Sequence, residues 1–230
     1  MKNLSDRVAI IGMGCTKFGE HWDKSEEDLI VEAAYEAFED AGIEPAQIEA
    51  GWVGTLTSGI SGQALSKPLK LQYIPITRVE NMCATGQDAL RNAAFAVAAG
   101  AYDLALVVGF EKLKDSGYSG LPGAPSTVIG AGNTAPGAFA LAANRYFHKY
   151  GASKEDLARI SVKNHYNGAR NRKAHFQKEI TLEQAMKAPM IASPLGLLDC
   201  CPTTDGAAAA IITRTEMAPQ STKDYVTIKA

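Results

Sequence analysis

The chain has 230 residues, of which 46% are hydrophobic and 21% are charged, and its formal net charge is −2. This composition allows a substantial buried core and offers no basic surface for a nucleic acid. No apolar run is long enough to span a membrane, and the first one, residues 8–11, is too short for a secretory signal peptide.

The first hundred residues alternate between strand and helix patterns. Ser25 is a typical helix N-cap and Gly42 a typical helix end. The predicted elements are strands over residues 7–12, 51–57, 76–81 and 103–109, and helices over 25–42, 62–73 and 84–99. This alternation predicts an α/β layered fold. The helix over 84–99 is apolar on nearly every face beyond Arg91, which predicts a helix buried in the middle of the domain.

The pattern changes after Glu111. Residues 112–137 are rich in Gly, Pro and Ser and are predicted to form a long loop, and such loops are usually functional or disordered. Further on, the sequence predicts helices over residues 136–150, 153–170 and from 181, then strands over 207–213 and 225–229. We therefore expect three segments: residues 1–111, an insertion over 112–195, and a return to the first domain over 196–230.

Cys83 stands where the predicted strand over 76–81 meets the predicted helix over 84–99. The first turn of a helix offers unpaired backbone N–H groups and a partial positive charge. Both favour the thiolate form of a cysteine, which is its nucleophilic form. Residues 84–86 are small, so an acyl group could approach closely. The alternative is a buried structural cysteine, the commonest role of this residue type.

The other cysteines, Cys15, Cys200 and Cys201, are predicted to be shielded and structural. Four cysteines without a C-x-x-C spacing predict neither a disulfide framework nor a metal site, and they fit a reducing cytoplasm. The candidates to activate Cys83 are the four histidines, His21, His148, His165 and His175. The alternative for each of them is a surface histidine without a catalytic role.

Basic residues cluster in the second half of the insertion, at Lys163, Arg170, Arg172, Lys173 and Lys178. Positive side chains of this kind can hold phosphate groups. A solvated helix face is an equally good explanation.

Four segments in order resemble the thiolase superfamily. They are residues 83–93, which resemble its nucleophilic-cysteine signature, 100–112, which resemble the strand after it, 145–151 in the insertion, and 194–209 before the last strand. Within the superfamily, the chain resembles the sterol-carrier-protein-2-type thiolases and the bacterial and archaeal acetyl-CoA acetyltransferase-like proteins. Glu80 stands where many thiolases have Asn, and Thr85 where Ser is common.

The resemblance implies an α/β/α thiolase-like fold: the N-terminal half with a helical insertion, or loop, domain, and no C-terminal half in this chain. It implies an acyl-CoA thiolase in which Cys83 carries the acyl group as a thioester. The family's activating histidine and second cysteine would lie in the C-terminal half. Coenzyme A would be a substrate and no cofactor would be bound permanently. His165, Lys163 and Arg172 are candidate contacts for coenzyme A.

The resemblance also implies a homodimer or hetero-oligomer, and some relatives work with a small zinc-ribbon/OB-fold subunit. Two other functions stay open. The same fold could serve a ketoacyl synthase, an HMG-CoA-synthase-like enzyme or a retro-aldolase. The chain could also be a non-catalytic acyl-CoA-binding half-thiolase or a truncated fragment.

Overall fold

The computed structural model describes residues 4–117 and 134–229. The chain separates into two compact units. The sheet unit consists of Met1–Ser116 and Thr204–Ala230, and the helical unit of Gly117–Thr203. The finer assignment to three segments stays a prediction. None of the described helices is long and apolar enough to cross a membrane.

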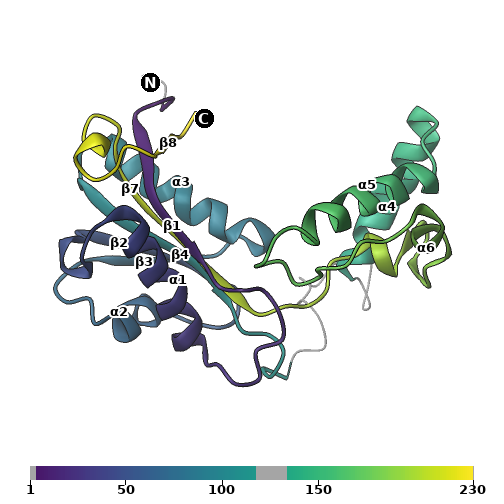
Figure 1. The fold of residues 1–230 in the computed structure, drawn as a ribbon, viewed down its shortest axis with the longest axis horizontal. Helices are drawn as coiled ribbons and strands as arrows, with labels where there is room; N and C mark the ends of the chain where they lie inside the picture. The colour runs from purple at the N-terminus through teal and green to yellow at the C-terminus, as the bar shows by residue number, and fades with distance from the viewer. Residues whose placement is uncertain (1–3, 118–133, 230) are drawn as a thin grey trace, which may run out of the picture. The chain divides into compact units, whose positions relative to one another are not determined.

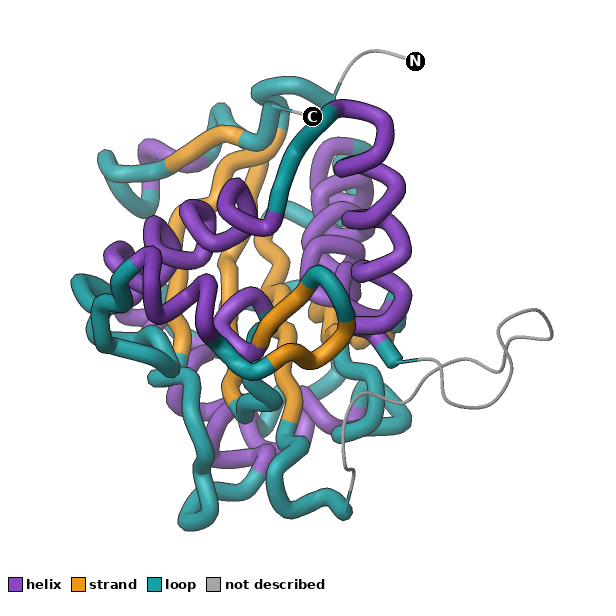
Figure 2. The backbone as a smooth tube through the Cα atoms, turned by 90° about the vertical axis from the view of Figure 1, so that its right-hand side faces the viewer, coloured by secondary structure: helices purple, strands orange, loops and turns teal. Residues whose placement is uncertain are grey.

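The described part of the sheet unit contains a mixed sheet of six strands in the order β3-β2-β4-β7-β1-β8 (Figure 1). The strands are β1 (Val8–Cys15), β2 (Ala50–Gly54), β3 (Ile76–Val79), β4 (Leu104–Glu111), β7 (Gly206–Arg214) and β8 (Val226–Thr227). Strands β3, β2 and β4 run parallel, whereas β7 pairs antiparallel with β4 and β1. Figure 2 shows these strands running side by side. A five-stranded sheet is the expectation from the first four strands and the late one. The sixth strand, β8, arises because the strand-like end of the chain pairs with β1.

Helices cover both faces of this sheet. Helices α1 (Glu26–Ala41) and α2 (Gln63–Leu69) pack with Ile11, Val53 and Leu106 in one core. Helix α3 (Thr85–Ala98) packs with Trp52, Val107 and Ile212 in a second core. Neighbouring strand residues such as Trp52 and Val53 belong to different cores, because successive side chains of a strand point to opposite faces of the sheet. The predicted α/β/α layering is confirmed.

Residues at both ends of α1 explain where the helix begins and ends. Ser25 and Asp28 form a capping box, in which the Ser25 hydroxyl accepts from the Asp28 N–H and the Asp28 carboxylate accepts from the Ser25 N–H. Gly42 ends the helix at a φ of 66°. Both predicted ends are confirmed.

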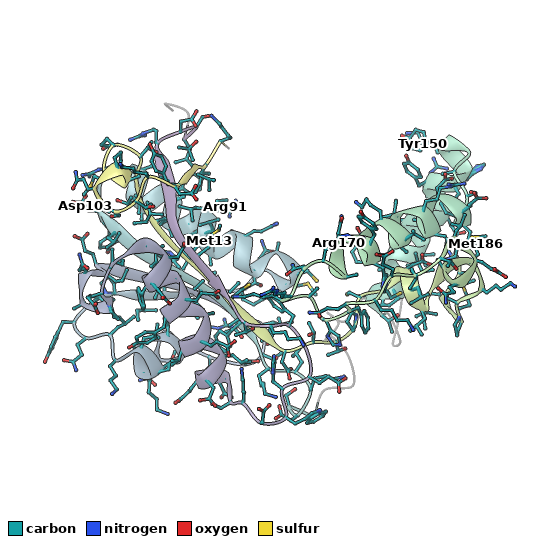
Figure 3. The ribbon with its side chains drawn as sticks, in the orientation of Figure 1. Met13, Arg91, Asp103, Tyr150, Arg170 and Met186 are labelled. Carbon is teal, nitrogen blue, oxygen red and sulfur yellow. The ribbon has the colours of Figure 1, made fainter. Side chains whose placement is uncertain are left out.

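Only one face of α3 is buried. Ala89, Ala93 and Val97 face the sheet and are fully buried, whereas Phe95 on the opposite face is 52% exposed. Arg91, labelled in Figure 3, also lies on the exposed face and forms an ion pair with Asp88. The prediction of a helix buried all round is therefore wrong for the described residues. In this unit a single sheet packs against α3, and nothing described covers its second face.

The described part of the helical unit contains three helices and a small hairpin. They are α4 (Ala135–Tyr150), α5 (Lys154–Gly168), α6 (Leu182–Lys187), β5 (Met190–Ala192) and β6 (Leu195–Gly196). Capping boxes of Ser153 with Asp156 and of Thr181 with Gln184 start α5 and α6, and Thr134 caps α4. The predicted loop over 112–137 lies mostly outside the described residues.

A buried carboxylate joins the segments at which the chain leaves the sheet unit and returns to it. Asp205 is fully buried and accepts from the backbone N–H of Leu113 (2.7 Å), Lys114 (3.0 Å) and His21 (3.1 Å). The Lys112 ammonium lies 3.2 Å from the same carboxylate. Burial raises the pKa of Asp205, but these hydrogen bonds outweigh burial and hold the pKa below its ordinary value.

Replacing Asp205 with Asn should destabilise the fold. Because Asn removes the buried charge that accepts from three backbone N–H groups and that pairs with the Lys112 ammonium beside Asp115, the expected loss is about 3 kcal/mol of unfolding free energy at neutral pH. Urea unfolding measures it. The lowered pKa means that Asp205 contributes this stability above about pH 4, its unfolded-state value, and loses it as the pH falls further. The difference between the two proteins should therefore shrink in acid.

Asp115→Asn is the matched control. Asp115 binds the same Lys112 ammonium at 2.7 Å, but its side chain is 44% exposed. An ion pair with one solvent-exposed partner is screened by water and contributes about 0–1 kcal/mol, so this variant, which keeps Asp205 beside Lys112, should stay close to the parent. Equal losses in both variants would contradict the anchoring role of Asp205.

Candidate active site

Cys83 lies at the edge of the sheet where its parallel strands end. A short 3-10 turn, Met82–Ala84, carries the cysteine between β3 and α3. Because β2, β3 and β4 run parallel, Gly54, Val79 and Gly109 share one register at this edge. Cys83 is exposed. The alternative of a buried structural cysteine is therefore wrong for Cys83.

Two glycines let the first turn of α3 approach the strands closely. Gly54 of β2 and Gly109 of β4 are direct partners in the sheet. A Cβ on Gly54 would lie 2.9 Å from the Thr85 Cγ2 and 3.1 Å from the Thr85 carbonyl oxygen. A Cβ on Gly109 would lie 3.4 Å from the Gly86 Cα. A side chain at position 54 would therefore push away the turn that carries Cys83.

The backbone before Cys83 is unusual. Met82 has a φ of 49°, in the left-handed region that non-glycine residues seldom adopt. The Thr85 hydroxyl donates to the Met82 carbonyl oxygen at 2.6 Å and accepts from the Asn81 N–H at 2.8 Å. The Glu80 carboxylate accepts from the Met82 N–H at 2.5 Å. In the sequence, Thr85 stands out only as a small residue, because these bonds depend on the turn itself.

A second network at the same edge orders the loop after β2. The Glu111 carboxylate at the end of β4 accepts from the Thr55 hydroxyl (3.0 Å), the Thr57 N–H (3.2 Å) and hydroxyl (3.1 Å), the Ser58 hydroxyl (2.7 Å) and the Leu56 N–H. The Arg78 guanidinium donates to the carbonyl oxygens of Gly59 (2.8 Å), Thr55 (2.7 Å) and Leu56 (3.2 Å). Neither Glu111 nor Arg78 is predicted from the sequence to order this loop, since nothing in the local pattern around them indicates which residues they contact.

The candidate contacts for coenzyme A lie in the helical unit. His165 of α5 lines a pocket of about 430 Å³. Its ring is nearly parallel to the Phe176 ring, with 5.9 Å between centroids, and its Nδ1 lies 3.1 Å from the Lys178 carbonyl oxygen. Lys163 and Arg172 are exposed and are not among the residues that line this pocket. The structure thus does not bring the three candidates together in one pocket.

The basic cluster is partly engaged within the helical unit. The Arg170 guanidinium, labelled in Figure 3, lies 3.4 Å from the centroid of the Tyr166 ring and forms an ion pair with Glu179 at 2.8 Å. This favours the interpretation of Arg170 as part of a packed surface rather than a phosphate ligand.

The histidines are divided between the two units. His21 is the histidine of the sheet unit, and its Nε2 lies 2.6 Å from the Lys17 carbonyl oxygen. His148 is exposed on α4, and His175 lines the same pocket as His165. This hydrogen bond engages one of the two ring nitrogens of His21.

The remaining cysteines differ in their exposure. Cys200 is half-buried, and burial raises the pKa of its thiol. Cys15 is also half-buried. Cys201 is exposed, so the prediction that it is shielded is wrong. It follows the 3-10 turn Leu197–Asp199 in an irregular segment and lines the same pocket as His165.

A family comparison decides the classification. The "Thiolase, N-terminal domain" family matches residues 8–216. The chain belongs to the thiolase family. An acetyl-CoA acetyltransferase of Methanothermobacter thermautotrophicus is 40% identical over 237 residues, which cover 97% of this chain and 61% of the relative. Sterol carrier protein 2 of Gallus gallus is 35% identical over 234 residues, which cover 91% of this chain and 41% of the relative.

A solved structure, the "Ltp2-ChsH2(DUF35) aldolase", resembles this chain with a TM-score of 0.80 and 31% identity. The match covers 94% of this chain and 58% of that one. The chain therefore spans about 60% of the length of the first of its curated relatives. These matches confirm the resemblance to sterol-carrier-protein-2-type thiolases.

Limited alkylation should rank the cysteines by their position. At low iodoacetamide, Cys83 should label about threefold faster than the exposed Cys201, since the positive end of a helix stabilises an anionic group placed beside it. Cys200 should label slowest, because burial raises its thiol pKa. Peptide mass mapping measures all three in one sample. Faster labelling of Cys201 than of Cys83 would contradict the assignment of the nucleophile to Cys83.

Proposed function

We propose that this protein is a thiolase-type acyltransferase in which Cys83 accepts an acyl group from an acyl-CoA as a thioester. One observation carries the proposal. Cys83 is exposed at the start of α3, at the edge where the parallel strands end, within a thiolase N-terminal domain. Acetyl-CoA acetyltransferase activity is named for a relative that is 40% identical, which supports the same reaction class here.

The chemistry follows from a thiolate nucleophile. In the cleavage of a 3-ketoacyl-CoA, the Cys83 sulfur attacks the 3-keto carbon and forms the new C–S bond. The bond between carbons 2 and 3 breaks, and the departing carbon takes a proton to give a shorter acyl-CoA. The thiol of coenzyme A then attacks the acyl-Cys83 thioester. The bond to the Cys83 sulfur breaks, and the acyl group leaves as the second acyl-CoA product. Coenzyme A is thus a substrate, and this cycle uses no permanently bound cofactor.

The resemblance assigns the activating histidine and a second cysteine to the C-terminal half of thiolases. Losing a general base costs about a hundredfold to ten-thousandfold in rate. Acylation of Cys83 and full turnover are therefore separate properties of this protein, and the first is the direct test of the nucleophile.

The pocket of the helical unit is a second part of this proposal. His165 and Phe176 would stack on a flat part of coenzyme A, and Lys163 and Arg172 would approach its phosphates from the exposed surface. The pocket is also lined by Leu157, Ile160 and Leu198, which offer an apolar surface beside the two rings.

An aldolase is the second candidate function. It is favoured by one observation, the 31% identity to a solved structure that is named an aldolase. An aldolase would cleave a carbon–carbon bond without an acyl group on Cys83. A non-catalytic acyl-CoA-binding protein would bind the thioester and leave it intact.

We further propose that the protein works in the cytoplasm as a homodimer or hetero-oligomer. The solved relative is named as a complex of two proteins, one of them a DUF35 protein. A small zinc-ribbon/OB-fold subunit is the corresponding partner proposed here.

Incubation with acetoacetyl-CoA should add one acetyl group to the protein, on Cys83. Intact mass measurement followed by peptide mapping locates it. Cys83→Ser should abolish the adduct, whereas Cys15→Ser, which removes another free thiol of the sheet unit, should leave it unchanged. Cleavage of an aldol substrate without any acyl-Cys83 would contradict the thiolase and support the aldolase.

Replacing His165 with Ala should weaken the binding of coenzyme A about fivefold, because a stacked ring contributes roughly 1 kcal/mol. Calorimetric titration measures the dissociation constant. His148→Ala is the matched control, since His148 is exposed on α4 and does not line the pocket. An equal dissociation constant for both variants would remove His165 from the binding site.

A further inference from the structure

Met82, the residue directly before Cys83, adopts a backbone conformation that its side chain disfavours. Its φ of 49° places a β-carbon in the left-handed region, which few non-glycine residues occupy without surrounding structure that holds them there. The conformation of Met82 sets the direction in which the chain enters residue 83. What holds Met82 therefore also determines where Cys83 lies.

Both polar groups of the Met82 backbone are bonded to side chains, and its carbonyl oxygen also accepts from the Thr85 N–H of the 3-10 turn. Its carbonyl oxygen accepts from the Thr85 hydroxyl at 2.6 Å, and its N–H donates to the Glu80 carboxylate at 2.5 Å. The Thr85 hydroxyl also accepts from the Asn81 N–H at 2.8 Å. A hydroxyl has one donor, so the donor of Thr85 is fully used on Met82.

These bonds are not ordinary helix capping. An N-cap side chain accepts from the N–H groups of the first helical turn, which follow it in the chain. Here the N-cap residue is Ala84, which makes no such bond, and the Thr85 hydroxyl reaches back to residues 81 and 82. The bonds therefore close a loop around Cys83, from the residues before it to the residue two positions after it.

The sheet fixes the hydroxyl in this orientation. Thr85 is only 7% exposed, and its Cγ2 lies where a Cβ on Gly54 would be 2.9 Å away. With the methyl group held against β2, the hydroxyl of the same side chain is directed by the staggered geometry of the Cβ. The bond between Thr85 and Met82 is itself part-buried.

We propose that Thr85 and Glu80 are positioning residues for Cys83. Thr85 holds the carbonyl group of Met82 and Glu80 holds its N–H, so that the left-handed turn persists and presents the thiol to the acyl carbon. This inference rests on the proposed function of Cys83 as the acyl acceptor. It adds that the turn is maintained by two side chains, neither of which need touch the substrate.

Four variants of the full protein test the proposal through the rate at which acetoacetyl-CoA acylates Cys83. Thr85→Val keeps the shape and removes the hydroxyl, and Thr85→Ser keeps the hydroxyl. Glu80→Ala removes the acceptor of the Met82 N–H, and Glu80→Gln keeps an acceptor oxygen. Thr85→Val and Glu80→Ala should each slow acylation about tenfold, the effect of losing roughly one hydrogen bond. Thr85→Ser and Glu80→Gln should stay within about twofold of the parent.

Thr213→Val is the matched control. Thr213 is 2% exposed, and its hydroxyl donates to the Asp103 carbonyl oxygen at 2.7 Å. It pairs with Leu104 at the start of β4, at the opposite end of that strand from Gly109. The control loses a buried hydroxyl as Thr85→Val does, so it should lose stability without slowing acylation. Glu80 is exposed, so its variants test the turn even where Thr85→Val fails to fold.

The outcomes separate this inference from the function on which it rests. If the parent protein forms no acyl-Cys83, the proposed nucleophile is wrong. If the parent acylates and Thr85→Val and Glu80→Ala acylate as fast as Thr213→Val, the positioning role is overturned. If Thr85→Ser is as slow as Thr85→Val, the methyl packing rather than the hydroxyl matters, which overturns the role of the hydroxyl.

Discussion

The close approach of α3 to a pair of glycines is the constraint on which the candidate site depends. Gly54 and Gly109 are neighbours across β2 and β4, and together they leave room for the backbone of the first helical turn. Ala89 and Ala93 continue this small surface along the helix and are fully buried. The helix therefore starts directly over the ends of the parallel strands, at the same edge as the loop ordered by Glu111 and Arg78. The exposed Cys83 is thus carried by a turn that packs against the ends of these strands.

A second constraint concerns the connections to the insertion. The sheet unit ends at Ser116 and resumes at Thr204, and Asp205 binds the backbone of Leu113 and Lys114. One buried carboxylate thus holds the outgoing and returning segments together within the sheet unit. This arrangement lets β4 and β7 pair directly, although a long stretch of sequence separates them. The sheet is continuous through the place where the insertion interrupts the chain.

The sequence predicts what depends on neighbours in the chain. The caps of α1, α5 and α6 were predictable because side-chain oxygens and orphan N–H groups within three residues determine them. The join that carries Cys83 was predictable from a strand pattern that meets a helix pattern. The all-round burial of α3 was a wrong prediction, because alanine was counted as evidence for a buried face. Alanine at positions 89 and 93 marks close packing on one face, while Phe95 shows that the opposite face is open.

Contacts between distant segments were not predictable in this way. Glu111 meets residues 55–58 only because β2 and β4 are adjacent, and this adjacency is a property of the sheet rather than of either segment. Likewise, Lys163 and Arg172 were selected for their charge, whereas the pocket beside His165 is built from rings and aliphatic side chains. Cys201 was assigned to packing by analogy with buried cysteines, but the irregular segment around it leaves it exposed.

Cys83 and most of the histidines lie in different units, and this bears on which steps of the proposed reaction each unit could serve. The sheet unit holds Cys83 and a single histidine, His21, whose Nε2 is bonded to the Lys17 carbonyl oxygen. In the proposed reaction, attack on the 3-keto carbon needs a nucleophilic sulfur and hydrogen-bond donors for the developing oxyanion, and the start of a helix is a place where backbone N–H groups can serve as such donors. Under the proposed function, the departing carbon also needs a proton donor. The thiolase resemblance implies that a histidine and a second cysteine do this acid–base work, and it places both in the C-terminal half of thiolases. The sheet unit would then supply the nucleophile of the proposed reaction and the geometry that holds it.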